Sequence, residues 1–241
     1  MVALVGVNKR FVKGKETITI FDRLDLAIPR GDFVAVMGPS GSGKTTLLNL
    51  LGGIDRADAG EVRIGGSRID GMSEGQLANW RAANIGFIFQ FYNLMPMLTA
   101  AQNVELPLLL TNLRKKERAE RVHTALSVVG LADRVKHHPR EMSGGQQQRV
   151  AIARALVSRP TVIFADEPTG NLDSATSGEI LDLLSEMVAD FGQTIVMVTH
   201  DARAAAIADR ILFLADGCIV KELKGADQGE IVAAMDAVGR Q

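Results

Sequence analysis

The sequence predicts an α/β fold built around a parallel β-sheet, and three observations support this. Three apolar segments, at residues 161–166, 194–200 and 210–217, end in polar residues, as buried strands of a parallel sheet do. Segments with helical periodicity separate them, which is the alternation expected of α/β proteins. A glycine-rich loop at residues 38–43 follows another apolar strand and opens a helix. Ligands of such sheets bind beyond the carboxyl ends of the strands, so we expect the functional residues there.

Composition restricts the classes of protein to which the chain can belong. Its 241 residues, 46% of them hydrophobic, suffice for one large domain or two small ones. A formal net charge of -1 disfavours a nucleic-acid-binding protein, which usually has a basic excess. The single cysteine, Cys218, excludes an internal disulfide framework and fits a reducing compartment. Because neither a signal-peptide pattern nor an apolar run of about 18 residues is present, we expect a cytosolic protein that can dock on a membrane protein.

The expected elements follow in a definite order. Residues 2–37 indicate mainly short strands, because turn residues interrupt the alternation in residues 17–28. From residue 99 to residue 156 the pattern is helical, punctuated by proline and glycine. The other expected elements are a strand at 33–37, a helix at 44–51, a strand near 61–64 and a strand at 85–90. We therefore expect one cassette with a helical insertion.

The segment GPSGSGKTT at residues 38–46 predicts a phosphate-binding loop. Gly38, Gly43, Lys44 and Thr45 satisfy the pattern G-x-x-x-x-G-K-[ST]. Glycines let backbone amides approach phosphate oxygens without a side-chain clash. Lys44 supplies a charge for the β and γ phosphates, and the Thr45 hydroxyl suits Mg²⁺. The strand before the loop and the helix after it favour this interpretation over a chance glycine-rich turn.

Polar side chains at three strand ends are candidates for catalysis. Asp166 and Glu167 follow the apolar residues of VIFADEP. Asp166 can orient the Mg²⁺ shell, usually through water, and Glu167 can polarise an attacking water as a general base. His200 suits a γ-phosphate sensor that anchors the water, and Gln90 can reach Mg²⁺ or the water. The alternatives are an acidic strand end that faces solvent and ordinary polar residues at strand ends.

The segment SGGQQQRVAIARAL at residues 143–156 indicates a second anion site. A hydroxyl and two glycines precede an amphipathic helix, so amides at the helix start can point at a phosphate. The alternative is that Ser143 is an ordinary N-cap, and both interpretations can hold together.

Together these segments resemble the ATP-binding cassette (ABC) transporter ATPase family over almost the whole chain. The resemblance rests on the order and spacing of GPSGSGKTT, Gln90, SGGQQQR, VIFADEP, GNLD at 170–173 and His200. It implies a P-loop NTPase cassette with a RecA-like parallel-sheet core, an antiparallel β subdomain and a helical subdomain. The single ABC domain, residues 1–241, would have its core and β subdomain at 1–94 and 159–241. The helical subdomain with the signature motif would occupy about 95–158.

The resemblance also implies an activity. Such proteins hydrolyse ATP to ADP and phosphate with Mg²⁺ as head-to-tail homodimers, and the signature segment of one subunit covers the ATP held by the other's loop. The two phosphate sites would therefore be halves of one site. The implied catalytic residues are Glu167, His200 and Gln90, the implied Mg²⁺ ligands are Thr45, Gln90 and Asp166, and Asp173 would lie in a loop at the dimer interface. The implied ATP-binding residues are Phe11, Gly38, Pro39, Ser40, Gly41, Ser42, Gly43, Lys44, Thr45, Thr46, Ser143, Gly144, Gly145 and Gln146.

Two positions depart from the family pattern. Met142 stands where the signature usually begins with leucine, and the exchange should matter little because both side chains are apolar. Phe11 stands where an aromatic residue, often tyrosine, stacks on adenine. A phenylalanine stacks as well but has no hydroxyl, and the alternative is that Phe11 is a core residue.

Within the family, GFIFQFYNLMPMLTAAQNVELPL and ADEPTGNLDS are similar to the branch of lipoprotein-release, macrolide-export and cell-division ATPases. The branch implies an integral membrane permease subunit with a large extracytoplasmic domain. It also implies a peripheral position on the cytoplasmic face of the bacterial plasma (inner) membrane. Apolar side chains in residues 91–110 suit a groove for a coupling helix or, equally, core packing. The run RKKER at 114–118 fits a solvated helix face.

Three other functions compete with this one. A soluble ABC ATPase acting on DNA would insert a long coiled coil, for which the gap between Gln90 and Ser143 is too short. Translation-associated versions join two cassettes in one chain. An ATPase of a non-transport membrane complex that controls cell division, cell-wall hydrolysis or signalling would use the same residues as an exporter.

Overall fold

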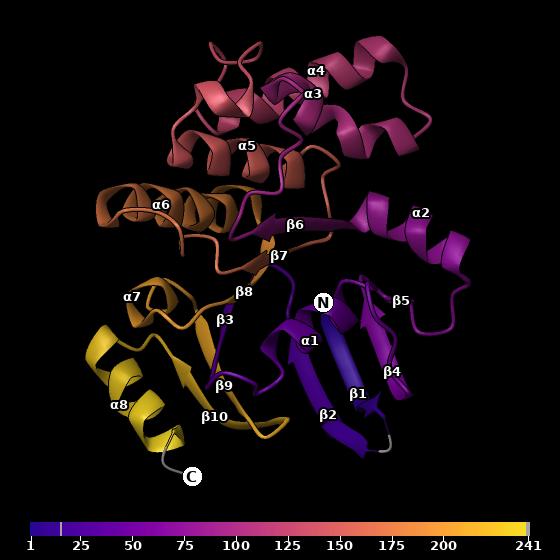
Figure 1. Cartoon of the computed structure of the whole chain (residues 1–241), viewed down its shortest axis with the longest axis vertical. Helices are drawn as coiled ribbons and strands as arrows, with labels where there is room; N and C mark the ends of the chain where they lie inside the picture. Colours follow the sequence, from indigo (N-terminus) through magenta and orange to yellow (C-terminus); the bar gives the residue numbers. More distant parts are fainter. Residues whose placement is uncertain (15, 240–241) are drawn as a thin grey trace.

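The computed structural model describes residues 1–14 and 16–239, which form two sheets with helices packed on them (Figure 1). One sheet has four strands in the order β2-β1-β4-β5, and the other has six in the order β10-β9-β3-β8-β7-β6. The strands are β1 Val2–Lys13, β2 Glu16–Ile28, β3 Phe33–Met37, β4 Ala59–Ile64, β5 Ser67–Arg68, β6 Ile85–Phe89, β7 Val162–Asp166, β8 Thr194–Val198, β9 Arg210–Ala215 and β10 Cys218–Lys224.

The six-stranded sheet is the parallel core that the sequence predicts. β3 pairs in parallel with β8 and β9, and β7 pairs in parallel with β6 and β8, while β10 joins β9 as an antiparallel edge strand. Along β3, Phe33, Ala35 and Met37 belong to one cluster of buried side chains, and Val34 and Val36 belong to another. Both faces of this sheet are therefore covered, which explains why its strands are continuous apolar runs.

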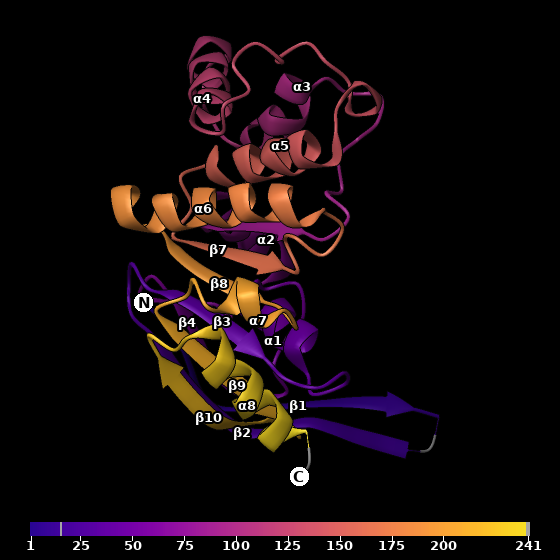
Figure 2. The same cartoon turned by 90° about the vertical axis from the view of Figure 1, so that its left-hand side faces the viewer.

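The four-stranded sheet departs from the sequence prediction. β1 and β2 form one long antiparallel hairpin, so the expectation of several short strands in residues 2–37 is wrong. Register shifts between Leu4 and Arg10 interrupt the alternation of apolar and polar residues without ending the strand pairing. Figure 2 shows the hairpin projecting from the body of the molecule.

The helices are divided between the two faces of the six-stranded sheet. α1 packs against β4, β7 and β8, whereas α5 packs against β6, α3, α4 and α6. Figures 1 and 2 both place α5 and α6 on one side of β6 and β7, and α1 on the other. The helices are α1 Lys44–Leu51, α2 Glu74–Asn84, α3 Ala100–Glu105, η1 Leu106–Leu110, α4 Lys115–Val128, η2 Pro139–Glu141, α5 Gly144–Leu156, α6 Ser174–Phe191, α7 Ala202–Ala205 and α8 Gln228–Val238.

Between β6 and β7 the chain leaves the sheet and forms a helical region. All of residues 90–161 are described, and none of them lies in a strand. α3, α4 and α5 pack on one another, at the end of the molecule opposite α8 (Figure 2). Among the described residues, no helix combines the length and the apolar character that crossing a membrane requires.

Candidate functional site

The loop after β3 leaves the backbone amides at the start of α1 free to face a ligand. Gly43, which precedes α1, is left-handed with φ 101° and supplies no side-chain cap. A helix N-terminus of this kind binds phosphate through its amides and its dipole. At the other end of the loop, a Cβ on Gly38 would lie 2.0 Å from the carbonyl oxygen of Leu214, so only glycine fits. The strand–loop–helix context that the sequence predicts for residues 38–46 is therefore present.

Two polar side chains of this loop have the properties expected at a phosphate site. Lys44 Nζ donates to the carbonyl oxygens of Gly38 at 2.9 Å and Pro39 at 2.8 Å. Burial lowers the pKa of Lys44, and the charges of Glu167 and Asp166, at the end of β7, oppose that shift. Ser42 is 6% exposed, and its Oγ has no hydrogen-bond partner among the described residues. Because buried hydroxyls are normally paired, Ser42 favours a polar ligand at this loop.

Strand register brings the predicted functional residues to one edge of the six-stranded sheet. Phe89 on β6 lies opposite Asp166 on β7, and Asp166 lies opposite Val198 on β8. Val198 in turn lies opposite Val36 on β3. The loops that follow these four positions therefore start side by side, at the carboxyl ends of the strands where ligands of α/β proteins bind.

Glu167 and His200 meet at this edge. The Oε1 atom of Glu167 lies 2.8 Å from Nδ1 of His200. The side chain of His200 is 68% exposed and that of Glu167 is 22% exposed, so the carboxylate is the more enclosed partner. Glu167 is left-handed with φ 46°, and its N–H donates to the carbonyl oxygen of Val198. Non-glycine residues in such conformations cluster at functional sites.

Asp166 lies half-buried in front of the loop. Burial raises the pKa of its carboxyl, the charge of Glu167 raises it further, and Lys44 acts in the opposite direction. A bound cation would stabilise two neighbouring carboxylates in their ionised forms. The Asp166 carboxylate, the Thr45 hydroxyl and the Gln90 amide oxygen are donors of the kind that Mg²⁺ prefers. These residues therefore fit the predicted metal.

Gln90 packs on the loop that follows Glu167. Asn171 Nδ2 donates to the carbonyl oxygen of Gln90 at 3.0 Å. A Cβ on Gly170 would lie 2.8 Å from Nε2 of Gln90, so this glycine leaves room for the amide. The structure thus brings Gln90 together with the loop that carries the two carboxylates.

Ser143 caps α5, which confirms the N-cap interpretation. Its Oγ accepts from the Gln146 N–H at 3.3 Å, and Gln146 Oε1 accepts from the Ser143 N–H at 3.1 Å. A Cβ on Gly145 would lie 2.3 Å from Cγ2 of Thr176, so α5 and α6 touch closely at this point. Because α5 and α1 lie on opposite sides of β6 and β7, the signature helix and the phosphate-loop helix occupy different faces of the sheet.

Asp173 caps α6 and stays exposed. Its Oδ1 accepts from the N–H groups of Ala175 at 3.1 Å and Thr176 at 3.0 Å, and its Oδ2 accepts from the Thr176 hydroxyl at 2.7 Å. The bonds from Thr176, and then that from Ala175, lower the pKa of the Asp173 carboxyl. The residue therefore has a structural role in α6, and the interface role that the resemblance implies stays a prediction.

Comparison with known proteins places the chain in a family. The sequence pattern described as "ABC transporter" matches residues 21–170. The chain belongs to the ABC transporter family. It is 48% identical over 225 residues to the uncharacterised ABC transporter ATP-binding protein YvrO of Bacillus subtilis (strain 168), which covers 93% of this chain and 98% of that protein.

Other ABC proteins show the same likeness. The lipoprotein-releasing system ATP-binding protein LolD of Porphyromonas gingivalis is 46% identical over 206 residues, which cover 86% of this chain and 94% of LolD. The macrolide export ATP-binding/permease protein MacB of Rhodopseudomonas palustris is 43% identical over 240 residues, which cover 100% of this chain and 36% of MacB. The dimeric ATP-binding cassette MJ0796 bound to ADP and Pi has a TM-score of 0.85 and 43% identity, covering 94% of this chain and 99% of that one. The predicted ABC cassette fold is therefore confirmed.

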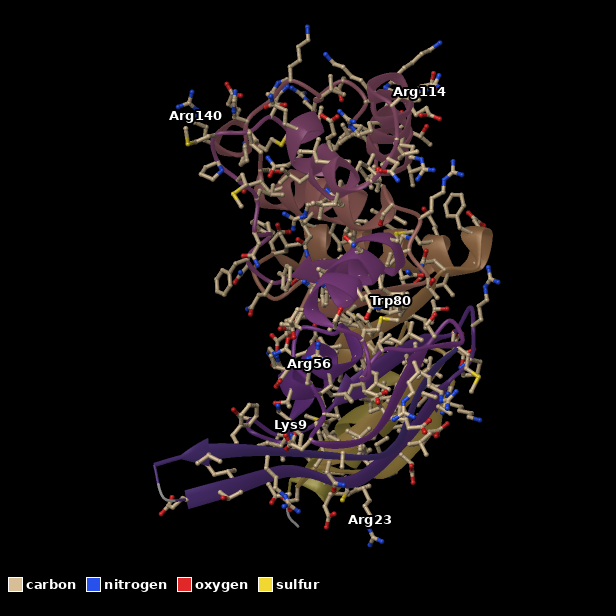
Figure 3. The ribbon with its side chains drawn as sticks, turned by 90° about the vertical axis from the view of Figure 1, so that its right-hand side faces the viewer. Lys9, Arg23, Arg56, Trp80, Arg114 and Arg140 are labelled. Carbon is tan, nitrogen blue, oxygen red and sulfur yellow. The ribbon has the colours of Figure 1, made fainter. Side chains whose placement is uncertain are left out.

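Phe11 occupies the position at which the ABC resemblance implies a residue that stacks on adenine. It lies on β1 opposite Ile18 and is 42% exposed, so it is not a core residue. Lys9 was not predicted: its Nζ lies 4.7 Å from the centroid of the Phe11 ring and 2.7 Å from Asp55 Oδ1. Figure 3 shows Lys9 and Arg56 side by side near the hairpin, where Lys9 Nζ also donates to the Arg56 carbonyl at 2.9 Å. The sequence did contain a signal for this contact: Lys9 and Phe11 are two residues apart, so both lie on one face of the strand.

Arg154 is a second residue that was not predicted. From the last turn of α5 it donates to the carbonyl oxygens of Tyr92 and Asn93, which are both left-handed, with φ 57° and 49°. Burial lowers the pKa of Arg154. In the sequence, Arg154 stands out as a charged residue among the apolar residues at the end of the helix. Its side chain holds the turn that follows Gln90.

The segment after Gln90 is divided between the core and the surface of this ABC subunit. Phe91, Met95 and Met97 are 72%, 55% and 86% exposed, whereas Leu94 packs against the larger hydrophobic core. Leu94 thus follows the core-packing alternative. For the exposed residues, the docking surface stays a prediction.

A groove borders the same helical region. It has a volume of about 510 Å³ and lies between Pro107 and Leu110 of η1 and Leu77 and Arg81 of α2. Leu110 is 73% exposed at its rim. The groove therefore lies between the helical region and the residues that follow α1.

Proposed function

We propose that this ABC transporter ATPase works as a head-to-tail homodimer that drives a separate membrane permease. The observation that carries the proposal is the meeting of Lys44, Asp166, Glu167 and His200 at one edge of the sheet, with the signature helix on the opposite face from α1. One chain therefore supplies a cradle and catalytic groups to one nucleotide and a signature segment to another.

The glycine-rich loop and β1 hold the nucleotide. Loop amides and the N-terminus of α1 bind the phosphates, and the Lys44 ammonium exchanges its carbonyl partners for phosphate oxygens, since charge-assisted bonds are stronger. Phe11 stacks on the adenine, with Lys9 on its ring. The residues in contact with phosphate in this arrangement are Gly38, Pro39, Ser40, Gly41, Ser42, Gly43, Lys44, Thr45 and Thr46.

Thr45, Gln90 and Asp166 hold Mg²⁺ in this proposal. The fit rests on the raised pKa of Asp166 beside a second carboxylate, and on the oxygen-rich character of the donor set. The ion supplies positive charge that neutralises the phosphate oxygens. For the chain itself, a cation there would relieve the repulsion between Asp166 and Glu167.

Glu167 acts as the general base on the attacking water. Its carboxylate accepts the proton, and His200 Nδ1, 2.8 Å away, fixes the direction in which Oε1 points. Glu167 has a left-handed backbone directly after β7, the kind of conformation that clusters at functional sites. Gln90 packs on the same loop and orients the water together with His200. Positioning and electrostatics supply most of the rate in phosphoryl transfer, and these contacts provide both.

The dimer completes each site. Ser143, Gly144, Gly145 and Gln146 of one subunit cover the γ-phosphate bound by the other, with the start of α5 as the anion-binding helix end. Two observations support this: α5 lies across the sheet from α1, and the similar cassette MJ0796 is a dimer. Asp173, exposed at the start of α6, lies in the loop that crosses the interface.

The membrane partner is an integral permease subunit with a large extracytoplasmic domain, and the ATPase is peripheral on the cytoplasmic face of the inner membrane. The support is the likeness to LolD and to MacB, an ATP-binding/permease protein of which this chain matches 36%. The exposed apolar residues Phe91, Met95 and Met97 offer the contact surface.

The exchange Glu167→Gln tests the proposal. It keeps the shape of the side chain and removes the base, so hydrolysis should fall by about 10²–10⁴-fold while ATP binding persists. The variant should accumulate as a dimer when gel filtration is run with ATP and Mg²⁺. Glu186→Gln, an exposed change on α6, is the matched control and should behave as the parent. Parental hydrolysis by Glu167→Gln would contradict the base assignment, and a monomer with bound ATP would contradict the dimer.

A further inference from the structure

We infer that Gln148 is a positioning residue that ties the signature helix to both catalytic loops of its own subunit and so couples the two nucleotide sites of the dimer. The inference rests on the homodimer proposed above. Gln148 lies on α5 and its side chain is fully buried, with 0% exposure. Its Nε2 donates to the carbonyl oxygen of Pro168 and, at 3.4 Å, to that of Phe89.

The two acceptors stand directly beside the residues proposed to act on ATP. Phe89 immediately precedes Gln90, and Pro168 immediately follows Glu167. β6 and β7 are neighbours in the sheet, so one amide group spans the ends of both strands. A bond to the Pro168 carbonyl holds the Pro168–Thr169 peptide, one residue beyond the left-handed Glu167, and so restrains the turn from which the Glu167 side chain extends.

The surroundings of Gln148 make a purely structural role a poor explanation. Its Oε1 atom is buried without a hydrogen-bond partner among the described residues, and burying an unpaired amide oxygen opposes folding. The neighbouring buried residues of α5 are apolar, Val150 and Ile152 among them. An apolar side chain of the same length would avoid the unpaired Oε1 but would leave the Pro168 carbonyl without this donor, so the donated bonds are what an amide adds here.

The position of Gln148 along α5 explains how it couples two sites. Ser143 starts the helix and would face the nucleotide of the partner subunit. Gln148 follows five residues later, about 7.5 Å along the same rigid helix. Within the described residues it is the one side chain of α5 that donates to both loops, whereas Arg154 reaches the loop after Gln90 alone. A shift of α5 at the partner's nucleotide is thus passed to Gln90 and Glu167 of the subunit's own site.

The test compares Gln148→Met with its neighbour Gln147→Met. Methionine keeps the length of the side chain but donates no hydrogen bond. Gln147 is the matched control because its amide donates only to Met142, at the start of its own helix, among the described residues. The readouts are the Kd for ATP, kcat, the Hill coefficient of hydrolysis against ATP concentration, and the melting temperature.

We expect Gln148→Met to bind ATP within about twofold of the parent, since the cradle is intact. It should melt near the parental temperature, because removal of the unpaired Oε1 offsets the loss of a donor to the Pro168 carbonyl. Its kcat should fall about tenfold or more, and the Hill coefficient should drop from above 1 in the parent to 1. In combination with Glu167→Gln it should still form the ATP-dependent dimer. Should Gln148→Met not fold, Gln148→Leu replaces it in the same assays.

Three results would overturn the inference: parental kcat and Hill coefficient in Gln148→Met, an equal loss in Gln147→Met, or a Hill coefficient of 1 in the parent. Failure of the proposed function looks different. In that case the parent itself would not hydrolyse ATP, or the Glu167→Gln protein would not dimerise with ATP.

Discussion

At the scale of single residues, the burial of the Asp166 carboxylate lowers the stability of the folded chain. Burial and the charge of Glu167 raise the pKa of its carboxyl, so the folded chain binds this proton more tightly than the unfolded chain does. The group therefore favours folding at a pH below its unfolded pKa of about 3.9, and this contribution is lost as the pH rises through the higher folded pKa. At neutral pH the ionised Asp166 destabilises the nucleotide-free protein.

We predict that Asp166→Asn raises the melting temperature of the nucleotide-free protein at pH 7. A gain on the order of 1 kcal/mol or less, since solvent screens this partly exposed carboxyl, corresponds to roughly 2–4 °C or less. Thermal denaturation followed by circular dichroism measures it. The gain should shrink as the pH falls toward about 4, because the parental carboxyl then becomes protonated.

The matched control for this prediction is Asp182→Asn, on the exposed face of α6. It should change the melting temperature little at either pH. A melting temperature of Asp166→Asn equal to that of the parent at pH 7 would show that burial of this carboxylate does not destabilise the fold.

At the scale of elements, α5 organises the turn that follows β6. Arg154 donates to two carbonyls of left-handed residues, Tyr92 and Asn93, from a half-buried position. A Cβ on Gly144 would lie 2.8 Å from the hydroxyl of Tyr92, so this turn also touches the beginning of the helix. The turn thus depends on contacts with α5 at both of its ends.

We predict that Arg154→Met loosens this turn. Hydrogen bonds from a charged donor contribute about 1.5–3 kcal/mol, so amide hydrogen exchange in residues 91–97 should become roughly 10–100 times faster. Arg149→Met is the control, because Arg149 on the same helix contacts Val129 and Glu179 instead. Equal exchange rates in the parent and Arg154→Met would remove Arg154 from the support of the turn.

At the scale of the whole molecule, exposed apolar side chains gather where the helical region leaves the sheet. Phe91, Met95 and Met97 project from the turn that joins β6 to α3. Because Leu94 is partly buried and packs against the core, a charge there would disturb the fold as well as the surface. Met97 is the better probe of docking, since it is 86% exposed.

We predict that Met97→Glu weakens co-purification with the membrane partner by placing an unpaired carboxylate in the contact. Basal ATP hydrolysis should be unchanged, because no group proposed to touch ATP is altered. Phe191→Glu, at the 64%-exposed end of α6, carries the same charge on another apolar residue and should co-purify normally. Normal recovery of the partner with Met97→Glu would place the docking surface elsewhere.

The sequence by itself determined the elements of the core and most of the candidate site. The loop at 38–46, the strand ends at Asp166 and His200 and the cap at Ser143 depend on neighbouring residues, whose spacing is visible in the chain. The hairpin of β1 and β2 was missed, because bulges break the alternation while the pairing continues.

Only the tertiary structure decided which side chains meet. The 2.8 Å approach of Glu167 to His200 depends on strand register between residues 33 positions apart. The partial burial of Leu94, the contact of Lys9 with Phe11 and the two bonds of Gln148 likewise arise where distant elements pack. Three consecutive glutamines look alike in the sequence, but Gln146 caps the helix, Gln147 folds back on Met142, and Gln148 faces the strands. The helical rotation of about 100° per residue separates their directions, and only packing shows what each one faces.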